Sequence, residues 1–125
     1  MSGQDLLEDL KKLENMLFIA TNKYEEALKE RAKAEHDYKV KLLEIIFIFR
    51  TEGYELNGKN TGQIAITACE NMAKGHPDVA ELRLKRDIAE ASVKATYERI
   101  NTLKYNIKAK EILINIELGL TKGQI

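Results

Sequence analysis

The stretch LLEDLKKLENMLFIATNKYEEA, Leu6 to Ala27, places apolar or small residues at intervals that alternate between four and three positions. The alternation continues to Ile48 and defines a first seam: Leu6, Leu10, Leu13, Leu17, Ala20, Tyr24, Ala27, Arg31, Ala34, Tyr38, Lys41, Ile45 and Ile48. A seam that persists for about six heptads is typical of a coiled coil. Because no glycine or proline interrupts it, we predict one long helix over 5–52.

A second seam with the same alternation follows in the last third of the chain: Val79, Leu82, Arg86, Ala89, Val93, Thr96, Ile100, Leu103, Ile107, Lys110 and Ile114. Pro77 precedes it at the first-turn position that proline favours in helices. Gly119 follows it, and glycine commonly ends a helix. We therefore predict a second long helix over 77–118 and a flexible tail over 119–125.

The segment between the two predicted helices is polar and rich in glycine. Asn57-Gly58 is a strong local turn signal, which predicts a loop over 53–61. Asn60 with Gln63 resembles a capping box, and a short helix is predicted to follow over 62–74.

Two predicted rods of similar length, joined by a compact connector, favour an antiparallel arrangement. The predicted fold class is therefore all-α, with two long antiparallel helices forming a coiled-coil hairpin. The short helix is expected in the connector, at the hinge end. A length of 125 residues fits a single helical domain over 1–125.

Composition excludes several classes of protein. Twenty basic residues balance twenty acidic ones, so the overall charge indicates no particular partner. The single cysteine, Cys69, predicts a reducing compartment, because it leaves no intramolecular disulfide to form. The N-terminal sequence has no secretory signal pattern, and no apolar run reaches the roughly 20 residues needed to span a bilayer. We expect a cytoplasmic protein without membrane contact.

No catalytic constellation is apparent in the sequence. His36 lies in a predicted helix without a metal-ligand partner at the preceding helical positions, and His76 fits the start of a helix. Cys69 falls on the apolar face of the predicted short helix and has no identifiable base. We therefore predict a protein that is not an enzyme and that holds neither a metal nor a cofactor.

The distribution of charge is more informative than its sum. Between Arg83 and Lys110 there are eight basic and three acidic residues, and two tyrosines lie among them. Basic residues interleaved with aromatics suit a single-stranded nucleic-acid backbone and its bases. The residues predicted to bind nucleic acid are Arg83, Arg86, Lys94, Tyr97, Arg99, Lys104, Tyr105 and Lys108. The alternative is a solvated helix face that complements an acidic helix.

Apolar residues outside the seams require a further partner, because a two-helix hairpin buries only one stripe of each helix. They are concentrated near the end of the first predicted helix, in the run from Leu42 to Phe49. Homo-oligomerisation, as a dimer or a higher assembly, is therefore predicted. The expected oligomer or partner contacts are Leu43, Ile46, Phe47, Ile64 and Met72.

The glycine-rich loop raises a second binding hypothesis. Lys59, Asn60 and Gly62 precede the short predicted helix, where free backbone N–H groups could hold a phosphate. The segment does not match the phosphate-loop motif, and no strand precedes it. It fits a plain connector as well as it fits an anion loop that binds a nucleotide or another small ligand.

The segment NMAKGHPDVAELRLKRDIAEASVKATYERINTLKYNIKAKEILINIE, residues 71–117, resembles in its layout small helical accessory proteins of phages and prophages. Over residues 23–117, the arrangement is similar to that of recombination mediators of the UvsY kind. The resemblance implies an oligomer in the cytoplasm of a bacterial host cell that binds single-stranded DNA as a recombination or replication accessory. Because this chain is less basic than a dedicated DNA-binding protein, a second hypothesis stays open. It is a phage-encoded inhibitor or adaptor that binds a host defence protein, such as a CRISPR effector, through the apolar hinge end.

Overall fold

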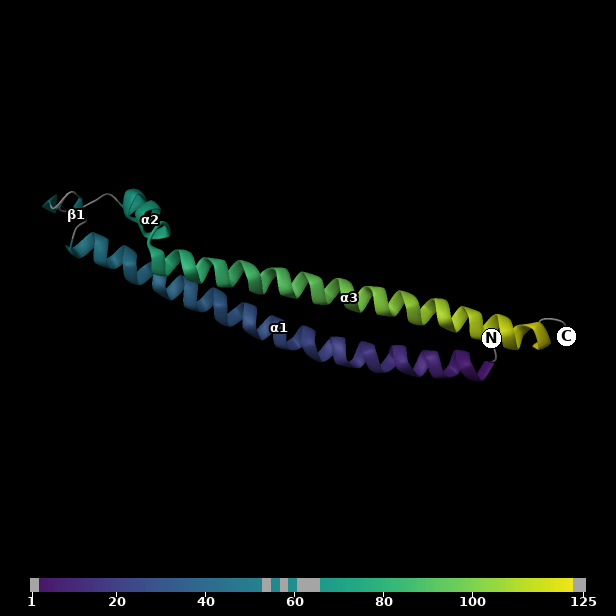
Figure 1. Cartoon of the computed structure of the whole chain (residues 1–125). Coiled ribbons are helices and arrows are strands. Elements are labelled where there is room, and N and C mark those ends of the chain that lie inside the picture. Colours follow the sequence, from purple (N-terminus) through teal and green to yellow (C-terminus); the bar gives the residue numbers. More distant parts are fainter. Residues whose placement is uncertain (1–2, 53–54, 57–58, 61–65, 123–125) are drawn as a thin grey trace. The chain divides into compact units, whose positions relative to one another are not determined.

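The computed structural model describes residues 3–52, 55–56, 59–60 and 66–122 of the chain (Figure 1). Helix α1 spans Gly3–Glu52, helix α2 spans Ile66–Lys74 and helix α3 spans Pro77–Lys122. Two-residue strands, β1 at Glu55–Leu56 and β2 at Lys59–Asn60, lie between α1 and α2. The prediction of an all-helical protein is confirmed, apart from this short pair of strands.

The connector differs from its prediction in one respect. β1 and β2 pair antiparallel, with Glu55 opposite Asn60 and Leu56 opposite Lys59. Asn60 therefore belongs to a strand pair, and Gln63, its partner in the predicted capping box, lies outside the described residues. The predicted Asn57-Gly58 turn lies outside the described residues. So does the predicted start of the short helix, since the described part of α2 begins at Ile66.

The end of the last helix also differs from its prediction. α3 does not stop before Gly119 but continues to Lys122, so 119–122 do not form a flexible tail. Gly119 has no left-handed φ, and no atom lies near the position of a Cβ there. A glycine in a helix interior costs only about 1 kcal/mol, which a long helix tolerates unless the chain also turns.

The turn between α2 and α3 is closed by backbone and side-chain hydrogen bonds. Gly75 N donates to the carbonyl of Met72 at 3.1 Å, and His76 N donates to that of Ala73 at 3.0 Å. His76 then caps α3: its carbonyl accepts the first helical hydrogen bond, from Ala80 N, at 2.8 Å. Its Nδ1 accepts a hydrogen bond from the backbone N–H of Asp78 at 3.2 Å. This confirms the interpretation of His76 as a helix-start residue.

The chain divides into two compact units, each of which contains parts of both long helices. Unit 1 comprises Met1–Ala27 and Ser92–Ile125, and unit 2 comprises Leu28–Ala91. In unit 1 the two helical segments run antiparallel, because Asp9 pairs with Lys110 and Tyr24 contacts Tyr97. Its core is formed by Ala20, Ile100 and Leu103, with Leu13, Leu17 and Tyr24 packed against them.

Unit 2 has its own core, which joins all three helices. Tyr38 and Ile45 from α1, Ala73 from α2 and Val79 from α3 are buried together. Cys69 is also fully buried, which confirms its interpretation as a small buried hydrophobe. Every residue of the two predicted seams is buried or half-buried in its unit. The seams were therefore read correctly from the sequence.

Candidate nucleic-acid interface

Five of the predicted nucleic-acid-binding residues lie on one side of α3 in unit 1. The 3.6-residue period of a helix brings Lys94, Tyr97, Lys104, Tyr105 and Lys108 onto one face, away from the second seam. All five side chains are exposed. We call this set the basic face. Tyr105 has 74% of its surface exposed and Tyr97 has 53%.

The lysines of the basic face are available to a ligand. Lys94, Lys104 and Lys108 form no ion pair with any described residue. Beside them, a shallow groove of about 300 Å³ is lined by Tyr105, Lys108, Ala109 and Ile112. An exposed aromatic ring, an apolar floor and an unpaired ammonium group therefore lie together. This combination suits a base and its phosphate.

Tyr97 differs from Tyr105 in its surroundings. Its ring lies 6.0 Å from that of Tyr24, with an interplanar angle of 44°. This tilted contact fixes Tyr97 against α1 within unit 1. Tyr105 is more exposed than Tyr97 and is therefore the better placed of the two tyrosines to stack on a base.

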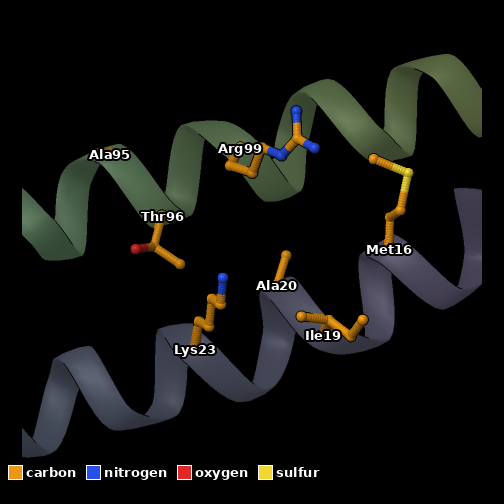
Figure 2. Close-up of a pocket in the computed structure, with 7 residues that line it drawn as sticks. All are labelled: Met16, Ile19, Ala20, Lys23, Ala95, Thr96 and Arg99. Carbon is orange, nitrogen blue, oxygen red and sulfur yellow. The ribbon is translucent and has the colours of Figure 1, made fainter.

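Arg99 lies on the opposite flank of the second seam from the basic face. It lines a groove of about 300 Å³ together with Met16, Ile19, Ala20, Lys23, Ala95 and Thr96 (Figure 2). In this view Lys23 and Thr96 extend into the space between the helices, and Met16 reaches from α1 toward α3. The sequence reasoning did not identify this groove. Arg99 and Lys23 sit beside the seam positions of their helices, and a helical-wheel comparison of the two seams would have found them.

Arg86 is occupied within unit 2. Its Cζ lies 4.4 Å from the centroid of the Tyr38 ring, and its Nη2 pairs with Asp87 Oδ1 at 3.2 Å. Partial burial lowers the pKa of Arg86, but the hydrogen bond and charge of Asp87, with smaller contributions from Tyr38 and Glu90, outweigh it and raise the pKa above its ordinary value. Arg83 is half-buried in the same unit. Neither arginine shares unit 1 with the basic face.

The predicted partner contacts are divided between surface and core. Leu43 and Phe47 are exposed over 66% and 67% of their surface. Ile46 is half-buried and packs against the core of unit 2, and Met72 is half-buried as well. Ile64 lies outside the described residues.

The predicted anion loop, Lys59, Asn60 and Gly62, lies only partly within the described residues. The backbone of Lys59 and Asn60 belongs to β2, whereas Gly62 lies outside the described residues. In the part of the chain that the structure describes, no group of three His, Cys, Asp or Glu side chains could hold a metal ion. His36 is exposed on α1.

Comparison with known proteins provides no family for this chain. No family model, no curated protein and no solved structure matches it. Among the helices described here, none combines the length and the apolar character needed to cross a membrane.

Proposed function

We propose that this protein is a non-enzymatic, homo-oligomeric helical protein of phage type that binds single-stranded nucleic acid as a recombination or replication accessory. The observation that carries the proposal is the basic face on one side of α3: two exposed tyrosines and three lysines that form no ion pair with any described residue. The antiparallel order of the two helical segments within unit 1 supports a helical hairpin as the scaffold. The bacterial cytoplasm is the compartment that this role requires.

Each part of the basic face has a separate task in the proposed complex. The ammonium groups of Lys94, Lys104 and Lys108 neutralise phosphates and release counterions, which makes binding weaker as salt rises. The ring of Tyr105 stacks on a base, an interaction worth about 1–3 kcal/mol that any base can provide. Recognition is therefore expected to depend on single-stranded character and not on sequence.

Fluorescence anisotropy with a labelled oligonucleotide tests the proposal. The double variant Lys104→Glu/Lys108→Glu is expected to bind more weakly and to lower the salt dependence, by about 0.7 in the slope of log K against log salt for each lost contact. Tyr105→Ala is expected to weaken binding without changing that slope. The matched control is Lys29→Glu/Lys33→Glu, which has the same four-residue spacing on exposed lysines of α1. Absence of binding by the natural chain at low salt would contradict the proposal.

A second candidate function is attachment to a host defence protein, as an inhibitor or adaptor. The observation in its favour is the exposure of Leu43 and Phe47, four residues apart and thus on one side of α1. Phe47→Asp is then expected to abolish capture of a host complex, such as a CRISPR effector, in a pull-down. Phe18→Asp is the control, because Phe18 is equally exposed but belongs to unit 1. Equal loss in both variants would contradict a specific role for Phe47.

A further inference from the structure

The groove between Met16 and Arg99 in unit 1 contains an imbalance of charge. In an antiparallel helix pair, residues that flank the seams on the same side face one another, and opposite charges are the favourable combination there. Here both charged residues that line the groove are cations, Lys23 and Arg99 (Figure 2). Neither forms an ion pair with any residue that the structure describes. Among the described residues, the lining of the groove therefore contains no carboxylate.

The complementary charge occurs further along the same flank of α3. Glu117 follows Arg99 by 18 residues, which is five full helical turns, so the two side chains leave the helix in the same direction. Glu117 is exposed and has no ion-pair partner among the described residues. About one helical turn before it, Leu113 is an exposed apolar residue on the same flank. At one end of this flank, Lys23 and Arg99 lie beside apolar residues. About 27 Å along the helix, Glu117 lies beside the apolar Leu113.

We propose that a second copy of this chain docks antiparallel on this flank and forms a two-fold symmetric dimer through unit 1. Arg99 of each copy pairs with Glu117 of the other. Met16 and Ile19, which are exposed in the single chain, pack against Leu113 of the second copy. Such an interface is isologous, because the same surface of both copies supplies the two complementary ends.

The middle of this flank allows the second copy to approach closely. Between Arg99 and Glu117 lies a second groove, of about 320 Å³, lined by Leu13, Asn106, Ala109, Lys110 and Leu113. Asn106 and Ala109 are small, and they occupy the level at which a two-fold axis would pass. Lys110 is already paired with Asp9 at 3.4 Å, so no unpaired charge is buried at this level.

This dimer would form the contact surface of the proposed homo-oligomer. The dimer can form whether or not the protein binds nucleic acid. The basic face lies on the other flank of the second seam and stays open in the dimer. Two basic faces on one assembly would raise the affinity for a long single strand through multivalency. Loss of the dimer and loss of the basic face are therefore separable by experiment.

A charge-swap experiment tests the dimer. Sedimentation equilibrium over a range of concentrations is expected to give a dimer for the natural chain. Arg99→Glu and Glu117→Arg are each expected to raise the dissociation constant about tenfold or more, because each places like charges together twice in the symmetric interface. The double variant Arg99→Glu/Glu117→Arg is expected to restore dimerisation. Lys104→Glu, on the basic face, is the control and should leave the dimer unchanged.

The outcomes are decisive because charge changes on an exposed flank leave the helical core intact, which circular dichroism of each variant verifies. A monomer at all concentrations, a trimer or a higher ring would overturn the proposal. So would a double variant no better than the single ones, or equal weakening by Lys104→Glu. If Arg99→Glu or Glu117→Arg loses the dimer but still binds a short oligonucleotide, the proposed interface is supported. The proposed nucleic-acid function is then unaffected.

Discussion

The guanidinium of Arg86 lies over the ring of Tyr38, with Cζ 4.4 Å from the ring centroid. Both residues occupy seam positions, one on α3 and one on α1, so a charged group takes the place of an apolar residue in the packing of unit 2. The stem of Arg86 covers apolar surface, while its charge is held by the aromatic ring and by Asp87. This arrangement allows the seam to tolerate an arginine.

Arg86→Met is expected to reduce the free energy of unfolding by about 0.5–2 kcal/mol, because methionine keeps the apolar stem but loses the cation–π contact. The raised pKa of Arg86 means that the contribution is fully present at neutral and acidic pH and is lost only as pH rises through that pKa in strong alkali. Urea denaturation measures the loss. Arg83→Met is the neighbouring control, and an equal effect in both variants would show that the ring contact is not responsible.

Ile45 and Phe47 are two residues apart on α1 but have opposite surroundings. Ile45 is buried in the core of unit 2, whereas Phe47 is exposed. Ile45→Ala is expected to cost about 2–5 kcal/mol of stability, and Phe47→Ala less than about 0.5 kcal/mol. Thermal or chemical denaturation compares the two. A large loss for Phe47→Ala would mean that its ring is covered, for instance by another subunit.

The cap that His76 provides for α3 is also testable. His76→Ala is expected to cost about 1 kcal/mol, because the N–H of Asp78 loses its acceptor. His76→Asn keeps an acceptor and should retain most of the stability. His76→Phe keeps an aromatic ring near Phe49, whose ring centroid lies 6.5 Å from that of His76, but it removes the acceptor. Full stability of the Phe variant would assign the effect to ring packing and not to capping.

Cys69 is expected to be protected from thiol reagents in the folded protein, since its side chain is fully buried in unit 2. Labelling with an aromatic disulfide reagent should be slow in buffer and rapid in urea. A Cys69→Ala/Ser92→Cys variant, with its cysteine at an exposed position of α3, provides the fast reference. Labelling of the natural chain at the rate of this reference would show that unit 2 opens readily.

The sequence by itself determined the helices and their buried sides. A three-four alternation is a local property, and every seam residue from Leu6 to Ile48 and from Val79 to Ile114 is buried or half-buried in its unit. Local signals were less dependable where two structures compete. Gly119 was expected to end the last helix, but the helix continues to Lys122. It continues because the cost of one glycine is small beside the gain from a long helix.

The tertiary structure alone decided how the charged residues are used. In the sequence, Arg86, Arg99 and Lys104 belong to one basic segment. Packing separates them: Arg86 lies over Tyr38, Arg99 borders a groove with Lys23, and Lys104 belongs to the exposed basic face. The physical reason is that the helical period fixes the direction in which each charged side chain leaves its helix. Its neighbours, however, come from residues far away in sequence, and only the register of the packed helices determines which of them it meets.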